Sequence, residues 1–233
     1  MLRAILFDFN GVILDDEEYH YLSLKRVLEE EGVSISREAY YRDCLGFGDT
    51  ECFEWGLEGS EKILAGGLSE LIRRKSAYYE ALLEHEARFF PGVCELIRET
   101  APAYPLGVAS MALRQEIDLA LLKAGLADLM TVIVSGEDVA RPKPAPEIYE
   151  LALAQMNLTL SRGNGRAKIT PPDCLVIEDS VPGIRSARAA GMRVLGVAHT
   201  VKQTELQEAD WVVPSLSGLS RKDLESFMAG GPS

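Results

Sequence analysis

The residues of this chain that could carry chemistry stand where predicted strands end. The first of them, Asp8, closes an apolar strand predicted over residues 3–9, and Asn10 and Gly11 follow it. A glycine in this place lets the chain turn sharply beside the acid. Open α/β sheets bind their ligands at the carboxyl ends of their strands, so the Asp8 carboxylate is the first candidate site residue.

Two other positions carry side chains that suit a phosphoryl group. Ser110 ends a predicted strand and precedes a helix, where a hydroxyl and the free N–H groups of the helix start can bind a phosphate oxygen. A serine there is also a common helix cap. Lys143 stands in the run Arg-Pro-Lys-Pro-Ala-Pro, whose prolines disfavour helical backbone. An ammonium held in this way can neutralise a phosphoryl group and a carboxylate together, and the alternative is a solvated lysine in a proline-rich turn.

Two adjacent acids, Glu178 and Asp179, close a strand predicted over residues 174–178. Carboxylates at the end of a buried strand are costly unless they are paired or bind a cation. Mg²⁺ prefers oxygen ligands and takes one or two carboxylates together with waters and substrate oxygens. The pair therefore predicts a magnesium site, and an exposed acidic turn is the alternative.

The remaining sequence predicts an α/β fold with an insertion. Strands and helices alternate after Pro91-Gly92, which implies a parallel, Rossmann-like sheet with helices on both faces. Nothing between residues 16 and 88 resembles a strand. We therefore expect an α/β core domain of residues 1–15 and 89–233, interrupted by an all-helical domain of residues 16–88. The predicted strands are 3–9, 105–109, 131–134, 174–178, 193–198 and 211–213. The predicted helices are 16–31, one or two within 37–58, 69–86, 93–100, 112–124, 146–156 and 182–190.

One connection in the predicted core is unusual. Residues 158–173 are polar, basic and glycine-containing, and they are more numerous than the roughly 2–6 residues that usually join a helix to a strand. A surface loop is expected here, and a contact with a partner or substrate is the alternative.

Composition excludes several classes of function. The net charge is 24 − 36 = −12, which argues against a nucleic-acid or anionic-membrane surface. A phosphorylated substrate stays possible, because one lysine or metal ion can reverse the field inside a pocket. No apolar run approaches the roughly 18 residues that span a membrane, and the amino terminus does not resemble a signal peptide. The four cysteines form no metal-type or C-x-x-C spacing, so we expect reduced, partly buried thiols and a cytoplasmic location.

Taken together, in this order and at these spacings, the sites resemble the haloacid dehalogenase (HAD) superfamily over nearly the whole chain. The helical insertion after the first strand resembles the cap of the β-phosphoglucomutase-like and phosphoglycolate-phosphatase-like branch. Finer matches to that branch are Leu14-Asp15-Asp16-Glu17 with His20, the Arg-Pro-Lys-Pro-Ala-Pro run, and Val-Ile-Glu-Asp-Ser-x-x-Gly.

The resemblance implies a function, a cofactor and roles for the candidate residues. It implies a Mg²⁺-dependent phosphatase in which Asp8 attacks phosphorus and becomes a phosphoaspartate. Ser110 and Lys143 are implied to bind the transferred phosphoryl group. The implied Mg²⁺ ligands are the Asp8 carboxylate, the backbone carbonyl of Asn10, Glu178 and Asp179. These roles agree with a loose, charge-spread transition state, for which positioning and charge neutralisation supply most of the catalysis.

Asn10 departs from the pattern of that family, in which a second Asp usually stands here. That Asp protonates the leaving oxygen and then activates the water that hydrolyses the phosphoaspartate. An amide can donate a hydrogen bond but cannot shuttle a proton, and loss of a general acid–base costs roughly 10²–10⁴-fold in rate. The metal site is expected to survive, because position 10 contributes only its carbonyl.

Several interpretations of Asn10 stay open. The first is a slowed or specialised phosphatase of a small phosphorylated metabolite, for which acyl phosphates and anhydrides would suffer least and His20 or Glu17 would supply part of the lost proton transfer. The second is a non-turnover protein that binds a phosphate ligand or regulates. A phosphomutase also needs acid–base help, so Asn10 counts against it. An engineered replacement of Asp by Asn is a further possibility.

A phosphonatase or dehalogenase relative is the remaining interpretation. The acidic pair counts against a dehalogenase, which would not need a metal. A phosphonatase needs a lysine in the cap to form a Schiff base. Lys62 and Lys75 are available, and both are expected on solvated helix faces.

The helical domain is expected to select the substrate by closing over the mouth of the core. Its loop over residues 45–51 matches the region that faces the active site in this branch, although an ordinary helix–helix turn is the alternative. The candidate substrate contacts are His20, Phe47, Asp49 and Thr50. The hinges are expected near Asp15-Asp16 and near residues 88–91. The expected partner is a small phosphorylated metabolite, without nucleic acid or membrane, and the expected state is a monomer or weak dimer.

Overall fold

The computed structural model describes residues 1–45, 47–58, 66–164 and 168–230. The chain folds as two compact units. The core unit comprises Met1–Asp15 and Arg88–Ser233, and the helical unit comprises Asp16–Ala87.

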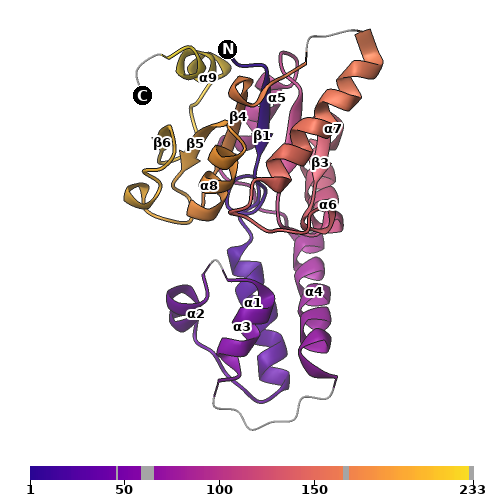
Figure 1. Ribbon diagram of the computed structural model, residues 1–233. Coiled ribbons are helices and arrows are strands. Elements are labelled where there is room, and N and C mark those ends of the chain that lie inside the picture. Colours follow the sequence, from indigo (N-terminus) through magenta and orange to yellow (C-terminus); the bar gives the residue numbers. More distant parts are fainter. Residues whose placement is uncertain (46, 59–65, 165–167, 231–233) are drawn as a thin grey trace. The chain divides into compact units, whose positions relative to one another are not determined.

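A six-stranded parallel sheet lies in the middle of the core unit, in the order β3-β2-β1-β4-β5-β6 (Figure 1). The strands are β1 (Ala4–Phe7), β2 (Leu106–Ala109), β3 (Met130–Val134), β4 (Cys174–Glu178), β5 (Arg193–Val197) and β6 (Trp211–Val213). Every residue of β1, β2 and β4 is buried, which explains why these strands are almost continuously apolar. Strands covered on both faces have no solvent side for polar residues to occupy.

Helices cover both faces of this sheet. The α-helices of the core unit are α5 (Val93–Thr100), α6 (Arg114–Ala124), α7 (Glu147–Asn164), α8 (Val181–Ala189) and α9 (Arg221–Met228). Short 3₁₀ turns lie at Ala127–Leu129, Gly136–Asp138, Pro171–Asp173 and Gln203–Glu205. On one face α7 and α8 bury Tyr149 and Ile184 against Leu6, Val176 and Val194 of the strands. On the other face α5 packs against α9.

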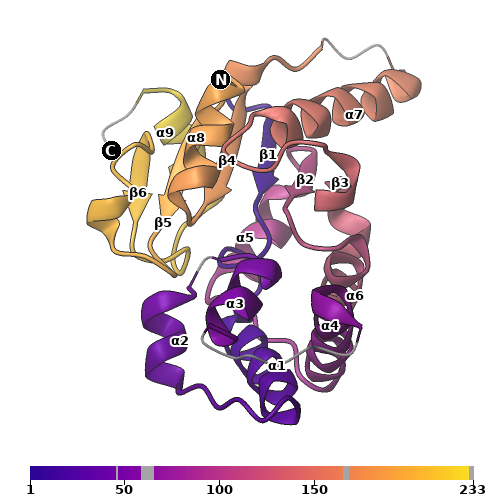
Figure 2. The same ribbon diagram turned by 60° about the horizontal axis from the view of Figure 1, so that its bottom comes forward.

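The helical unit has its own apolar core. Its helices are α1 (Glu17–Glu30), α2 (Arg37–Asp43), α3 (Asp49–Gly56) and α4 (Gly67–His85), and Figure 2 brings them to the front. The α1 and α4 helices pack against each other more extensively than any other pair in this unit. Leu24, Leu28, Phe53 and Leu71 are almost fully buried in the cluster that joins the helices. A core of this kind allows the insertion to hold its own shape between the two parts of the core unit's chain.

The prediction of a parallel, helix-covered α/β sheet is confirmed, and two details of it were wrong. The helix predicted over 146–156 continues through Asn164, so the first part of the predicted loop is helical. Asn157 explains how the chain then returns, because its side chain accepts from the N–H of Ile169 at 2.8 Å and donates to the Ile169 carbonyl at 2.9 Å. Residues 165–167 lie outside the described residues. The helix predicted from residue 112 begins at Arg114, so Ser110 is not its cap.

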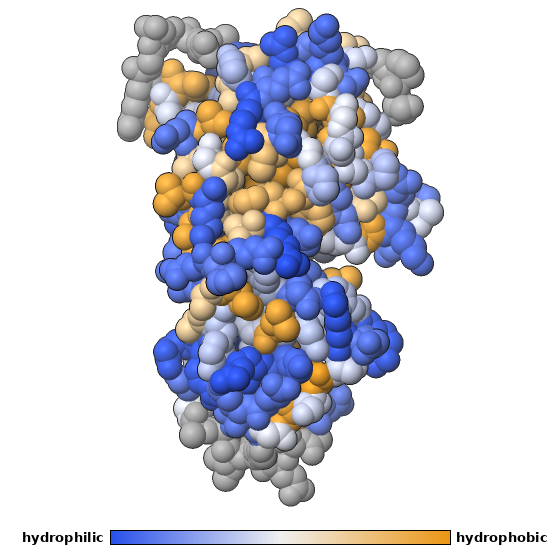
Figure 3. All heavy atoms as spheres, turned by 180° about the vertical axis from the view of Figure 1, so that it is seen from behind, coloured by the Kyte–Doolittle hydropathy of each residue, from blue (hydrophilic) through white to orange (hydrophobic). Residues whose placement is uncertain are grey.

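The surface of the core unit carries apolar as well as hydrophilic side chains (Figure 3), and the four cysteines are free thiols. On the face shown in Figure 3, hydrophilic side chains cover much of the helical unit, and apolar side chains gather in the middle of the core unit. Within the described ranges, no helix is long and apolar enough to cross a membrane. All four cysteines are free, and burial raises the pKa of the Cys174 thiol to about 12, so this thiol stays protonated at neutral pH.

Candidate active site

The strand order brings the predicted site residues to one place. The sheet is built outward in both directions from β1, which lies between β2 and β4. A crevice forms at such a switch point, outside the carboxyl ends of the strands. Asp8 follows β1, Ser110 follows β2, and Asp179 follows Glu178 at the end of β4. Asp8, Ser110, Glu178 and Asp179 are all buried, with no more than 8% of each residue's surface exposed.

Lys143 lies between two of the acids. Its Nζ is 2.9 Å from Oδ1 of Asp8 and 2.6 Å from Oε1 of Glu178, and its side chain is 8% exposed. The alternative of a solvated lysine in a proline-rich turn is therefore wrong. The proline-rich segment leads from β3 into α7, and it carries the ammonium to the acids at the centre of the sheet.

Glu178 is surrounded by donors from the protein. Its Oε1 accepts from Lys143 and, at 2.9 Å, from the hydroxyl of Tyr149. Its Oε2 accepts from the backbone N–H groups of Asp179 and Ser180 and from the Ser180 hydroxyl. A fully buried carboxylate needs such partners. These hydrogen bonds fix the orientation of the Glu178 carboxylate, which in turn positions the Lys143 ammonium.

Asp8, Glu178 and Asp179 form a group that could hold a metal ion, with one carboxylate oxygen from each lying within 4.8 Å of the others. Among the described residues, Lys143 is the one cation that forms ion pairs with any of these three acids, so the ionised group carries an excess of negative charge. Oδ1 of Asp8 is buried and receives no aligned hydrogen bond from any residue that the structure describes. Hard oxygen donors with an uncompensated charge suit Mg²⁺. The residues present therefore fit the implied ion.

The pKa values of this group reflect burial and mutual repulsion. Burial raises the pKa of Asp8 to about 6, with Lys143 lowering it and Glu178 raising it. Burial, followed by the charges of Glu178 and Asp8, raises the pKa of Asp179 well above its usual range. Burial alone would lower the pKa of Lys143, but the two acids beside it outweigh burial and raise it. The lysine therefore stays charged, and a cation bound by the acids would favour their ionised forms.

Asn10 and Ser110 meet across the site. The Ser110 hydroxyl donates to Oδ1 of Asn10 at 3.4 Å and accepts from the N–H of Ala112 at 3.3 Å. The side chain at position 10 thus lies beside the serine that is predicted to bind the phosphoryl group. An amide at this position can hold a ligand by hydrogen bonds, but it has no proton acidic enough to be transferred to a leaving group.

The predicted substrate contacts lie in the helical unit. Lys75 of this unit contacts two of them, His20 and Asp49. Its Nζ is 2.7 Å from Nδ1 of His20 and 2.5 Å from Oδ1 of Asp49, and Lys75 is only 3% exposed. Nε2 of His20 is 3.2 Å from Oδ2 of Asp16, and the His20 ring stacks on Tyr79. The expectation that Lys75 lies on a solvated helix face is therefore wrong.

The remaining predicted residues of the helical unit are at its surface or have other partners. Phe47 is 55% exposed, and Thr50 is exposed in the first turn of α3. Glu17 accepts a hydrogen bond from Tyr40 at 2.5 Å. Lys62 lies outside the described residues. A role for any of them toward a substrate stays a prediction.

Sequence reasoning missed three side chains that contact the site. Tyr149 of α7 donates to Glu178, and no local pattern marks a tyrosine in a helix for this purpose. His199 and Thr200 contact Gly11 and Asp179. Both residues follow β5. Asp8, Ser110 and Asp179 were predicted because they are polar residues at the carboxyl ends of strands, and the same rule could have found His199 and Thr200.

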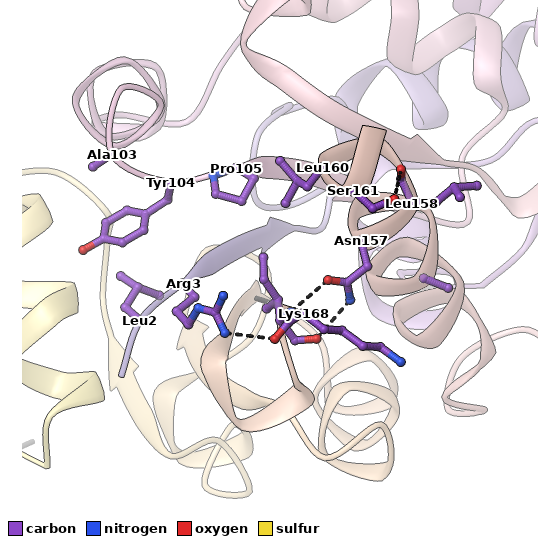
Figure 4. Close-up of a pocket in the computed structure, with 12 residues that line it drawn as sticks. Leu2, Arg3, Ala103, Tyr104, Pro105, Asn157, Leu158, Leu160, Ser161 and Lys168 are labelled. Carbon is purple, nitrogen blue, oxygen red and sulfur yellow. Dashed lines mark hydrogen bonds between the residues drawn. The ribbon is translucent and has the colours of Figure 1, made fainter. Parts of the chain in front are cut away.

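A pocket of about 680 Å³ lies away from this chemistry (Figure 4). Its walls include Arg3, Tyr104, Asn157 and Lys168, which stand at or before the amino ends of strands or on the last turns of α7. Arg3 donates to the carbonyl of Lys168 at 2.9 Å, and none of the acids described above lines the pocket. Its size alone does not make it the reactive site, because the reactive groups are at the opposite edge of the sheet.

Comparison with known proteins agrees with this geometry. Residues 5–197 match the model of the family described as haloacid dehalogenase-like hydrolase. The CbbY protein of Rhodobacter capsulatus is 30% identical, with 93% of this chain and 94% of that one covered. The β-phosphoglucomutase of Bacillus subtilis is 28% identical (94% and 92% covered), and a phosphorylated carbohydrates phosphatase of Thermotoga maritima is 28% identical (86% and 87%).

A solved structure extends the likeness to three dimensions. An Asp-to-Asn variant of CbbY from Rhodobacter sphaeroides, in complex with xylulose 1,5-bisphosphate, superimposes with a TM-score of 0.78 at 28% identity and covers 94% of this chain and 96% of its own. The family match spans most of the chain and includes Asp8, Ser110, Lys143, Glu178 and Asp179. This chain belongs to the haloacid dehalogenase-like hydrolase family, in the branch of CbbY and β-phosphoglucomutase.

Proposed function

We propose that this protein is a Mg²⁺-dependent phosphatase of a small phosphorylated metabolite, of the sugar phosphate class, which is slowed or specialised by Asn10. The observation that carries the proposal is the position of Lys143, whose ammonium contacts the buried Asp8 and Glu178 beside Asp179. A carboxylate, a fixed cation and a group of metal-binding oxygens at one strand end are the parts that phosphoryl transfer requires. Relatives named as a sugar-phosphate mutase and a carbohydrate phosphatase support the substrate class.

Asp8 is the nucleophile in this proposal. A carboxylate oxygen of Asp8 forms a bond to phosphorus while the bond from phosphorus to the leaving oxygen breaks, and the product is an aspartyl phosphate. Water then attacks phosphorus, which releases inorganic phosphate and restores the carboxylate. Bound Mg²⁺ would neutralise charge on the phosphoryl oxygens, held by Asp8, Asp179, the Asn10 carbonyl and, as a fourth candidate, Glu178. Both carboxylate oxygens of Glu178 already accept hydrogen bonds from the protein. Asp8 and Asp179 are therefore favoured as the direct carboxylate ligands of Mg²⁺.

Lys143 and Ser110 stabilise the transferred group. The lysine is already beside the Asp8 oxygen, so it can neutralise charge that passes from the nucleophile to the phosphoryl oxygens without moving far. The Ser110 hydroxyl is at the end of the neighbouring strand and can donate to a phosphoryl oxygen in place of Asn10. Substrate selection belongs in the same proposal to the helical unit, with His20, Phe47, Asp49 and Thr50 as candidate contacts.

The effect of Asn10 on the rate of hydrolysis is expected to depend on the leaving group of the substrate. An alkyl phosphate releases an alkoxide that needs a proton, which the amide cannot supply. An acyl phosphate releases a carboxylate that needs none. We therefore expect the ratio of acyl to alkyl phosphate hydrolysis to exceed that of a relative with Asp in this position.

The test is release of inorganic phosphate from acetyl phosphate and from a panel of sugar phosphates, with Mg²⁺ and with EDTA. We expect release that depends on Mg²⁺ and is faster with acetyl phosphate, after correction for its spontaneous hydrolysis. Equal rates for the two classes of leaving group would refute the role given to Asn10. Rates that EDTA leaves unchanged would refute the metal.

A binding protein without turnover is the second candidate. Asn10 favours it, because the amide accepts a hydrogen bond from Ser110 and lacks the acid function. The Asp-to-Asn variant of CbbY, which holds a sugar bisphosphate, shows that a relative with such a replacement can bind a ligand of this class. This candidate predicts tight binding of a sugar phosphate and less than one turnover per protein molecule. Many turnovers with any sugar phosphate would exclude it.

A further inference from the structure

The dipeptide His199-Thr200 contacts the metal-binding group from the neighbouring strand. It follows β5, which pairs with β4. Nδ1 of His199 lies 2.9 Å from the carbonyl oxygen of Gly11 and donates to it. The Thr200 hydroxyl donates to Oδ2 of Asp179. One short segment therefore touches both the loop after Asp8 and the acid at the end of β4.

The hydrogen bond from His199 to Gly11 helps to fix the direction of the Asn10 carbonyl. That carbonyl and the N–H of Gly11 belong to one planar peptide group. The Gly11 N–H donates to the carbonyl of Leu14 at 3.0 Å, which fixes the plane, and His199 holds the next carbonyl along the chain. Both polar backbone atoms of Gly11 are thus held. The direction of the Asn10 carbonyl, an implied metal ligand, depends on them.

The loop also lies directly against Asp179. Gly11 has φ of +76°, and a Cβ built on it would be 2.0 Å from Oδ2 of Asp179. The same oxygen accepts the hydrogen bond from the Thr200 hydroxyl. A carboxylate among other acids tends to rotate or take up a proton, and a hydroxyl donor fixes its rotation and favours its ionised form. Thr200 therefore orients the carboxylate where the loop and the acid meet.

The His199 ring is itself held in place. It stacks on Phe90, with ring centroids 4.0 Å apart and planes 10° apart. Burial lowers the pKa of His199, so the imidazole is neutral at neutral pH. Because a carbonyl only accepts, the proton is on Nδ1, and Nε2 has no hydrogen-bond partner among the described residues. The ring is a fixed donor to Gly11.

We propose that His199 and Thr200 are positioning residues of the cation site. Through Gly11 and Asp179 they hold the Asn10 carbonyl and the Asp179 carboxylate in the arrangement that binds a divalent cation. The inference rests on the proposed Mg²⁺ function. Partners one step beyond the metal ligands commonly change metal affinity by about 10–100-fold when they are removed.

Matched pairs of variants test it, with Mg²⁺ itself as the probe. Thr200→Val removes the hydroxyl at constant shape, and Thr200→Ser keeps it. His199→Phe keeps a ring to stack on Phe90 without the donor, and His199→Asn keeps a donor at the position of Nδ1. We expect the Mg²⁺ dissociation constant, measured by titration calorimetry without substrate, to rise about 10-fold or more for Thr200→Val and His199→Phe. For Thr200→Ser and His199→Asn the dissociation constant should stay within about 3-fold of that of the unmodified protein, and thermal unfolding should show that all four variants are folded.

The outcomes separate this inference from the proposed function. Unchanged Mg²⁺ affinity in Thr200→Val and His199→Phe would overturn the positioning role. Loss of affinity in His199→Asn equal to that in His199→Phe would also overturn the assigned role of Nδ1. Absence of Mg²⁺ binding in the unmodified protein would overturn both proposals. The Mg²⁺ affinities of the four variants could change as expected while the protein hydrolyses no phosphate ester. That result would support the positioning role and refute the phosphatase.

Discussion

The Ser110 hydroxyl donates to Oδ1 of Asn10 at 3.4 Å, which links the ends of the neighbouring strands β1 and β2. The oxygen that accepts this bond occupies the place that a carboxylate oxygen would have if position 10 were an Asp. The amide of Asn10 therefore offers the same shape and the same acceptor as a carboxylate would, without an acid function.

The Asn10→Asp variant is expected to turn over phosphate esters faster. The gain in kcat should be about 10²–10⁴-fold for an alkyl phosphate, because a general acid–base becomes available. For acetyl phosphate the gain should be smaller, since its leaving group needs no proton. Steady-state phosphate release measures both. The Mg²⁺ dissociation constant is the control and should change little, because position 10 offers its backbone carbonyl. Unchanged kcat for both substrates would mean that another residue transfers the proton.

The Lys143→Met variant is expected to lose stability as well as activity. It leaves Asp8 and Glu178 buried without their cation, and breaking a buried charged pair in this way costs about 3–5 kcal/mol. Urea unfolding at neutral pH without Mg²⁺ measures the loss. Lys202→Met, at an exposed position, is the matched control and should change the free energy of unfolding by about 0.5 kcal/mol or less. Equal effects of the two variants would show that the ion pairs of Lys143 contribute nothing to folding.

The stability of the metal-free protein should depend on pH through Asp8. Burial raises its pKa from 3.8 to about 6, so between these values the folded protein binds a proton that the unfolded chain releases. The contribution of Asp8 to stability therefore falls as the pH rises through this window. Asp8→Asn removes the titration. In EDTA its Tm should exceed that of the unmodified protein near pH 8, and the difference should shrink toward pH 4.

Adding Mg²⁺ is the control for that comparison. Ligand binding to the folded state raises Tm, and only the protein with Asp8 keeps the full ligand set. Mg²⁺ should therefore reduce or reverse the advantage of Asp8→Asn near pH 8. A Tm difference that is the same at all pH values in EDTA would show that Asp8 does not titrate as described.

The Gly11→Ala variant is expected to lose Mg²⁺ binding. A methyl group there would lie 2.0 Å from Oδ2 of Asp179, and the backbone has φ of +76°, so the loop or the acid must move. Gly125→Ala is the matched control, with φ of +63° and no atom within 4 Å of the added Cβ. It should cost about 1–2 kcal/mol of stability from backbone strain and leave Mg²⁺ affinity unchanged. Equal Mg²⁺ affinity in both variants would contradict the close approach of the loop to Asp179.

The sequence by itself determined the α/β class and most of the site in the core unit. Apolar runs at Ala4–Phe7 and Cys174–Glu178 predict buried parallel strands, because a strand covered on both faces has no polar side. Polar residues directly after such strands must share one edge of a parallel sheet. Local pattern and this one rule were enough to predict that Asp8, Ser110 and Asp179 meet.

Only the tertiary structure decided which groups pair. Local sequence gives no signal that α7 continues to Asn164, that Lys75 is buried against Asp49, or that Tyr149 reaches Glu178. His199 and Gly11 are 188 positions apart, and their hydrogen bond exists because the order of the strands brings the ends of β1 and β5 to the same edge. Contacts of this range depend on how whole elements pack, whereas the strand and helix patterns depend on residues within a few positions of one another.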